Sequence, residues 1–186
     1  MRFFIALDIP EKSRQELKII QQKLKTLIPE ATLQESEQLH LTIAFIGERP
    51  DDLKEKLIEV MAKASKNIKP FSVAPSFIDG FPHLHTARVL WAGVKGEVDD
   101  LYILRHNIKD GLSSLNLTTD ERRYVPHIAL AKLPKIILTK DIEEKLQSFL
   151  DKDLGPITVS SVKLFESVPN HGLHTHNTLA EIKLLS

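Results

Sequence analysis

The sequence contains no cysteine, which excludes disulfides, thiolate nucleophiles and cysteine-ligated zinc. It has no excess of either charge, because 25 Lys and Arg residues balance 25 Asp and Glu residues. Without a global positive field the chain cannot hold a long nucleic acid nonspecifically, so any contact with nucleic acid should be local. Long hydrophobic runs are absent as well. The apolar run at residues 3–7 is too short for a signal-peptide core or a membrane span, so we expect a cytoplasmic protein.

Short apolar runs and amphipathic stretches alternate along the 186 residues, of which 42% are hydrophobic. In the first half, the pattern predicts strands at residues 2–9, 40–46, 71–78 and 88–94. Apolar residues at helical spacing predict helices between Pro10 and Pro29 and over residues 53–64. No low-complexity linker divides the chain, so we expect residues 1–186 to form a single domain.

The second half repeats this order of elements. A helix is predicted over residues 98–115, a short strand at residues 127–131 and a helix that starts near Thr139, a fair cap residue. Strands at residues 157–165 and 178–184 follow. The repeated order of helix, strand, helix and strand pair indicates two related lobes.

Each half carries one histidine at the start of a short strand. Because alternate side chains of a strand share a face, His40 and Thr42 should point one way and Phe45 the other way, into the core. The same alternation places Ala129 beside His127. Small and polar residues on both histidine faces indicate a cleft in place of a packed layer, and the two faces could meet across it.

Two imidazoles suit the cleavage of a phosphodiester near neutral pH. One can accept a proton from water while the other donates one to the departing alkoxide, and a 2′,3′-cyclic phosphate requires both steps. A single histidine in a strand is usually a structural residue. Two histidines at equivalent places in an apparent duplication are less easily explained as structural residues.

The segments His40-Leu41-Thr42-Ile43 and 126–131 resemble the paired His-x-Thr motifs of the 2H phosphoesterase superfamily. The resemblance is strongest to its RNA 2′,3′-cyclic phosphodiesterase branch, also called the 2′-5′ RNA ligase family, and it spans nearly the whole chain. It implies a bilobal, pseudo-symmetric α+β fold in which two antiparallel sheets line a central groove and helices lie outside. It also implies hydrolysis to a 2′-phosphate without a metal or other cofactor.

The resemblance further implies residue roles. His40 would donate a proton to the leaving 3′-oxygen, His127 would activate water, and Thr42 would bind the phosphate; the acid and base roles could be exchanged. Ala129 stands where the second motif usually has Thr or Ser, so one hydroxyl donor is missing. Loss of such a donor can cost roughly 2 to 4 kcal/mol if nothing replaces it. Lys132 stands where the family usually has Arg and is a candidate phosphate contact, although strict alternation would aim it away from His127 unless the strand bends or ends there.

Further residues are candidates for contact with RNA. Phe81 lies beside Gly80 and Pro82 in a predicted turn, where its ring could stack on a nucleobase or pack beneath the loop. Arg88 and the pair at positions 122 and 123 are candidate phosphate contacts. Trp91 lies in an apolar strand and is interpreted as core.

The remaining histidines leave a metal site as an alternative. Five of these six crowd two predicted loops and are His83, His85, His171, His174 and His176. Zinc would require three or four ligands, and no acidic partner lies at a recognisable spacing, so we interpret these histidines as polar loop residues near the groove.

We therefore expect a monomeric cyclic phosphodiesterase that acts on RNA ends or cyclic nucleotides, without a membrane or an obligatory protein partner. Two alternatives are a protein that binds RNA ends or nucleotides with weakened catalysis, and a 2′-5′ RNA ligase. A third, a metal hydrolase that uses the loop histidines, would lose its activity with a chelator.

Overall fold

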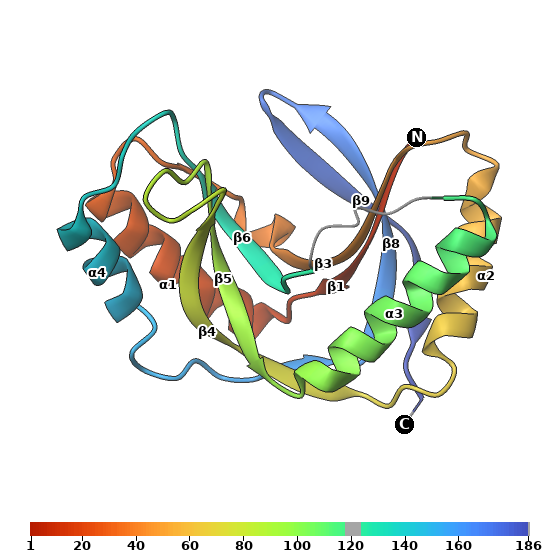
Figure 1. The fold of residues 1–186 in the computed structure, drawn as a ribbon. Helices are drawn as coiled ribbons and strands as arrows, with labels where there is room; N and C mark the ends of the chain where they lie inside the picture. Colours follow the sequence, from red (N-terminus) through yellow and green to blue (C-terminus); the bar gives the residue numbers. More distant parts are fainter. Residues whose placement is uncertain (118–123, 186) are drawn as a thin grey trace.

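The computed structural model describes residues 1–117 and 124–185. Within them, nine strands form one antiparallel sheet (Figure 1). The order along the sheet is β7 (Ile157–Val159), β4 (Phe71–Phe81), β5 (Val89–Gly96), β6 (His127–Lys132), β3 (His40–Glu48), β1 (Arg2–Asp8), β8 (Ser161–Asn170) and β9 (Leu173–Lys183). The short strand β2 (Thr32–Leu33) pairs with β6. The strands with histidines at their first residues, β3 and β6, are therefore neighbours at the centre.

Helices cover the two halves of this sheet in separate pairs (Figure 1). The helices α1 (Glu11–Leu27) and α4 (Lys140–Ser148) lie beside the half that contains β4, β5 and β6. The helices α2 (Leu53–Ser65) and α3 (Val98–Ser114) pack against each other and against β3, β8 and β9. A short 3₁₀ turn, η1 (Ser36–Gln38), leads directly into β3.

The predicted patterns explain why these helices form where they do. α1 buries Leu17, Ile20 and Leu24 on one face, and α4 begins after Thr139, whose hydroxyl accepts a hydrogen bond from the Ile142 N–H at 3.3 Å. Most buried apolar residues join into one large cluster that runs through both halves, and Phe4, Ala6 and Phe165 form a small separate one. The α+β class with helices outside is confirmed.

The two halves meet at a narrow seam between β3 and β6. A single registered pair, Leu41 with Ile128, joins these strands, whereas β5 and β6 share a longer ladder. The two expected sheets are thus continuous through this one contact and form one curved sheet. Because so little backbone pairing holds the seam, other contacts must help to fix how β3 and β6 lie.

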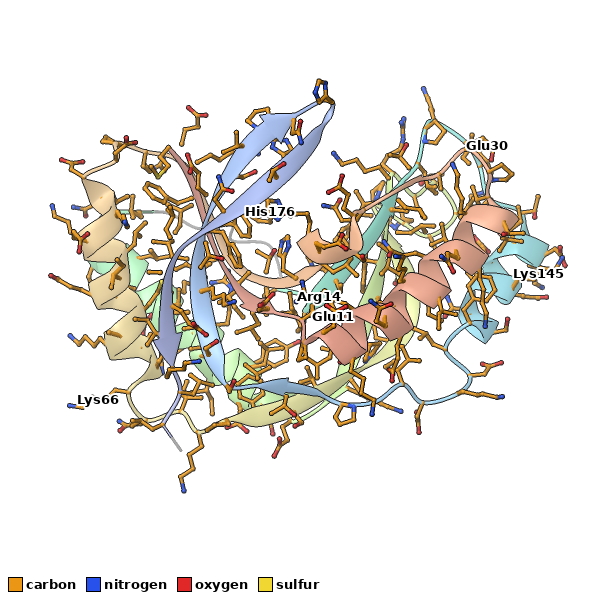
Figure 2. The ribbon with its side chains drawn as sticks, turned by 180° about the vertical axis from the view of Figure 1, so that it is seen from behind. Glu11, Arg14, Glu30, Lys66, Lys145 and His176 are labelled. Atoms are coloured by element: carbon orange, nitrogen blue, oxygen red, sulfur yellow. The ribbon has the colours of Figure 1, made fainter. Side chains whose placement is uncertain are left out.

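The hairpin of β8 and β9 is longer than predicted and projects from the body of the protein (Figures 1 and 2). Its turn has His171 and Gly172 at positive φ, 47° and 81°. The predicted strand at residues 157–165 is interrupted at position 160, and the predicted strand at residues 178–184 starts at Leu173. The extra length carries polar side chains, so hydrophobic alternation did not predict it.

Candidate active site

His40 and His127 begin the two central strands of the sheet. The antiparallel pair Leu41 and Ile128 joins β3 to β6, and each histidine precedes one member of that pair. Extending the register by one residue places His40 opposite Ala129, which shares a face with His127. The two histidines are therefore diagonal neighbours on one face of the sheet, a distance that side chains can span.

The two imidazole rings are held in the same way. His40 Nδ1 lies 2.8 Å from the Gln38 carbonyl oxygen, and His127 Nδ1 lies 2.7 Å from the Val125 carbonyl oxygen. A carbonyl oxygen can only accept, so Nδ1 carries the proton in both rings. Nε2 is the remaining nitrogen of each ring, and it is left to accept or donate a proton.

Burial lowers the pKa of both histidines below its ordinary value. For His40 the hydrogen bond to Gln38 opposes this effect, the charge of His127 adds to it, and the carboxylate of Asp8 opposes it. For His127 only the hydrogen bond to Val125 opposes burial. Asp8 thus distinguishes two otherwise similar imidazoles, because it favours the protonated form of His40.

A β-bulge in β3 brings a further residue onto the histidine face. Ile43 is an extra residue in β3 relative to β1, so the alternation of side chains is reset beyond it. Phe45 therefore shares the face of His40 and Thr42, and it is 61% exposed. The prediction that Phe45 packs in the core beside Leu41 is wrong, because it assumed an unbroken alternation.

A second bulge occurs at the equivalent place in β6. Leu130 is an extra residue relative to β5, and its carbonyl oxygen accepts a hydrogen bond of 2.9 Å from the buried Gln21 side chain of α1. Lys132 consequently returns to the face of His127 and Ala129. Strict alternation alone would have aimed Lys132 away from His127, and the bulge is the bend in the strand that prevents this.

These side chains surround a pocket of about 290 Å³. Its lining residues are Arg2, Phe3, Phe4, Gln34, Gln38, His40, Thr42, Phe45, His127, Ala129, Lys132, Ser167, His174 and His176. Among the described residues that line it, none is Asp or Glu, and Arg2 and Lys132 are cationic. The charge of the pocket therefore suits a ligand that carries an anionic group, and its polar and aromatic side chains suit hydroxyl or aromatic groups on the same ligand.

Two expected substrate contacts lie outside this lining. The Phe81 ring packs edge-on to His127, with centroids 5.0 Å apart, and lies 4.9 Å from the ring of Trp91, which is 3% exposed. Arg88 is exposed next to the start of β5. The interpretation of Trp91 as core is confirmed. Contact of Phe81 or Arg88 with substrate stays a prediction.

The family model described as AKAP7 2′5′ RNA ligase-like domain matches residues 1–184. The chain belongs to this family. A protein of Methanocaldococcus jannaschii named RNA 2′,3′-cyclic phosphodiesterase is 31% identical over 167 residues, which cover 90% of this chain and 91% of that protein. A protein of Aeropyrum pernix with the same name is 27% identical over 161 residues, which cover 87% of this chain and 90% of that protein.

Solved structures share the fold of this 2′5′ RNA ligase-like chain. A Thermus thermophilus protein superposes with a TM-score of 0.80 at 23% identity and covers 99% of this chain and 98% of its own. Escherichia coli LigT, complexed with 3′-AMP, has a TM-score of 0.79 at 21% identity and covers 100% and 98%. The family that the two histidine motifs indicated is confirmed.

Two histidines interpreted as loop residues instead lie in β9 and line the pocket of the 2′5′ RNA ligase-like site (Figure 2). The ring of His176 packs edge-on to His40 with centroids 4.7 Å apart, and its backbone N–H donates to Gln38 Oε1 at 2.7 Å. Burial, with the charges of His40 and His174, lowers the pKa of His176 to about 4. His174 Nδ1 lies 3.1 Å from Ser167 Oγ. The polar hairpin thus reaches the site.

A smaller pocket of about 170 Å³ adjoins the first, since Gln38, His40 and His176 line both. It holds an ion pair of 2.7 Å between Asp8 and Lys163. Asp8 is registered with His40 across β1 and β3. The Asp8 carboxylate that influences His40 is therefore fixed by its own cationic partner.

Tyr124, which lies three residues before β6, forms a hydrogen bond to β3. Its hydroxyl donates to the Thr42 backbone carbonyl at 2.8 Å, and burial raises its pKa, so the hydroxyl stays protonated. The bond spans the seam where the two strands share one registered pair. Sequence reasoning missed this link. The arginines at positions 122 and 123 lie outside the described residues.

The other histidines lie away from the pocket. His83 and His85 are exposed between β4 and β5, and His85 Nδ1 lies 3.5 Å from Glu143 Oε1. In the described part of the chain, no three or more His, Asp or Glu side chains are grouped to hold a metal ion. No helix of the described residues is long and apolar enough to cross a membrane.

Proposed function

We propose that this chain is an RNA 2′,3′-cyclic phosphodiesterase that opens a terminal 2′,3′-cyclic phosphate to a 2′-phosphomonoester. The observation that carries the proposal is the pair of imidazoles, His40 and His127, on one face of one pocket with both Nδ1 atoms bound to carbonyls. The Methanocaldococcus jannaschii protein named RNA 2′,3′-cyclic phosphodiesterase, which is 31% identical over 90% of the chain, supports the proposal.

The reaction needs one proton removed and one supplied. Neutral His127 accepts a proton from water at Nε2 while the water oxygen forms a bond to phosphorus. Protonated His40 donates from Nε2 to the 3′-oxygen as the P–O3′ bond breaks, which leaves a 2′-phosphate and a 3′-hydroxyl. The bound cyclic phosphate carries one negative charge, which favours protonation of a nearby imidazole and so offsets the effect of burial.

Asp8 supports the assignment of His40 as the acid. Its carboxylate favours the protonated form of His40, whereas no acidic group raises the pKa of His127. The two rings interact, so they titrate as a coupled pair. The proposed assignment of His40 as acid and His127 as base therefore depends on the charge of Asp8, which lies outside the main pocket.

Thr42 and Lys132 are the proposed phosphate contacts. Both line the pocket on the histidine face, and both are donors that can stabilise charge on the non-bridging oxygens. Ala129 also lines the pocket but offers no donor. Among the described residues that line the pocket, the cations are Arg2 and Lys132. Two cations can bind few phosphates, so the end of an RNA would occupy the pocket and the rest of the strand would lie outside it.

The experiment is hydrolysis of 2′,3′-cyclic mononucleotides in the presence of a chelator, with the product isomer identified by phosphorus NMR. The proposal expects turnover that persists with chelator and yields the 2′-phosphate. A 3′-phosphate product, or activity lost with the chelator and restored by a metal, would contradict it.

Ala129 favours one alternative, a protein that binds RNA ends with weakened catalysis. This alternative predicts that cyclic and 2′-phosphorylated nucleotides bind without measurable turnover. The reverse reaction, in which a 5′-hydroxyl attacks the cyclic phosphate to form a 2′-5′ linkage, uses the same two imidazoles. It would be detected as joined RNA ends at high concentrations of both.

A further inference from the structure

The outer part of the β8–β9 hairpin, residues 167–178, has an unusual composition for an exposed segment. The hairpin projects from the body of the protein (Figure 1). Residues 167–178 include no Asp, Glu, Lys or Arg, although these four types make up 27% of the chain. Exposed segments ordinarily carry such charged side chains. This segment instead offers the hydrogen-bonding groups of Ser, Thr, Asn and His.

One face of the hairpin forms a wall of the main pocket. Ser167 is registered with His176 and Pro169 with His174, so these two cross-strand pairs share a face. Ser167, His174 and His176 all line the pocket. His174 lies two residues, about 7 Å, farther along the strand toward the tip than His176. The pocket wall therefore continues outward along the hairpin.

Gln38 holds the hairpin in place relative to His40. The Gln38 backbone carbonyl oxygen lies 2.8 Å from His40 Nδ1, and its side-chain Oε1 accepts a hydrogen bond of 2.7 Å from the His176 backbone N–H. The ring of His176 also packs edge-on to that of His40, with centroids 4.7 Å apart. A group bound on the hairpin is thus held at a set distance from the proposed acid.

His174 is oriented to bind a ligand through one nitrogen. Its Nδ1 lies 3.1 Å from Ser167 Oγ, so the half-buried ring is held on the pocket face of the hairpin and Nε2 is the nitrogen left for a ligand. Phosphates are bound chiefly by Lys and Arg, which residues 167–178 lack. The groups of a nucleic acid that suit this surface are therefore sugar hydroxyls and the edges of bases.

We infer that the hairpin binds the nucleotide that precedes the one carrying the cyclic phosphate, and that His174 Nε2 forms a hydrogen bond with its ribose 2′-hydroxyl. This role rests on the proposed function and deepens it. A pocket of about 290 Å³ is at the small end of ligand pockets, so it holds the terminal nucleotide and the preceding one lies at its rim. The 2′-hydroxyl can donate and accept, and it distinguishes RNA from DNA.

The test uses three substrates that carry the same reacting group. They are adenosine 2′,3′-cyclic phosphate, the diadenosine ribo dinucleotide that ends in this group, and a deoxy dinucleotide that lacks only the 2′-hydroxyl of its first nucleotide. In the unmodified protein, kcat/KM for the ribo dinucleotide should exceed that for the deoxy dinucleotide by about 2- to 10-fold, as expected for one hydrogen bond.

His174→Ala should bring the ratio of the ribo to the deoxy dinucleotide to about one. It should also lower kcat/KM for the ribo dinucleotide by about 2- to 10-fold more than for the mononucleotide. His171→Asn is the matched control, because it removes another imidazole of the hairpin outside the pocket lining, and Asn tolerates the positive φ of 47° at this position. The control should keep the ratio of the unmodified protein.

Three results would overturn the role of the hairpin. The first is an unmodified protein that turns over the two dinucleotides equally well. The second is a His174→Ala variant that loses the same factor on all three substrates, since a structural effect alone would do this. The third is loss of the ribo preference in Arg88→Ala with none in His174→Ala, which would place the strand on the side of β4 and β5.

Failure of the proposed function is a separate result. If the unmodified protein turns over none of the three substrates, the hydrolase proposal fails. Calorimetry with the two dinucleotides that carry a 2′-phosphate in place of the cyclic group then decides the role of the hairpin. Tighter binding of the ribo form by about 2- to 10-fold that is lost in His174→Ala supports the role, and equal affinities of the two forms overturn it.

Discussion

Phe45 and Lys132 occupy equivalent positions, each the fifth residue after a strand histidine and each turned into the same pocket by one extra residue in its strand. The extra residues are Ile43 and Leu130. The backbone is thus pseudo-symmetric, whereas the chemistry at the two ends of the pocket is not. One end of the pocket carries the aromatic ring of Phe45 and the other the ammonium of Lys132, so the two ends differ in the groups that they can bind.

Replacement of either central histidine should abolish hydrolysis and preserve the fold. His40→Ala and His127→Ala each remove a proton-transfer group, so kcat should fall by at least about 100-fold. Circular dichroism and thermal unfolding check the fold, and His83→Ala, on the exposed loop, serves as a control that retains full activity. Near-normal turnover in either of the first two variants would contradict the two-histidine mechanism.

The pH dependence should identify which histidine is the acid. Burial lowers the pKa of both, so kcat/KM should peak below about pH 6.5 and fall as pH rises, because the acid loses its proton. Asp8→Asn removes a charge that raises the pKa of His40, and therefore lowers that pKa further.

At pH values above both pKa values, the rate is proportional to the protonated fraction of the acid. If His40 is the acid, Asp8→Asn should lower kcat/KM there by up to about tenfold, for a shift of up to about one pKa unit. If the variant instead matches the unmodified protein at high pH and exceeds it at low pH, His40 is the base.

The strands with their histidines, the helices and the family could be predicted from the sequence, because they depend on local periodicity and short motifs. The face that Phe45 occupies was predicted wrongly, and the face of Lys132 could not be fixed, since one extra residue inverts an alternation and leaves no mark in the hydrophobic pattern. His176 was missed for another reason: its strand carries polar side chains, and its contact with His40 arises only in the folded chain.

Ala129→Thr should raise the rate. Ala129 lines the pocket, so an added hydroxyl would project beside the phosphate and supply the donor that the second motif lacks. Recovery of one such donor corresponds to an increase in kcat of up to about 100-fold. Ala129→Val adds the same volume without the hydroxyl and should not raise kcat. An unchanged or lower rate in Ala129→Thr would mean that another group already fills the role.

Tyr124→Phe should slow catalysis by loosening the seam between β3 and β6. The lost hydroxyl leaves the Thr42 carbonyl without this hydrogen bond, so the free energy of unfolding should fall by about 1 to 3 kcal/mol. Because one registered pair joins the strands, the two imidazoles should also lose alignment, and a misplacement of about 1 Å can reduce kcat by about 100-fold.

Tyr102→Phe is the matched control, because the Tyr102 ring packs edge-on to Tyr124 and its hydroxyl is not the one that binds Thr42. kcat should fall in Tyr124→Phe more than KM changes, whereas Tyr102→Phe should alter neither. A normal kcat at a temperature where Tyr124→Phe is fully folded would show that this bond contributes to stability alone.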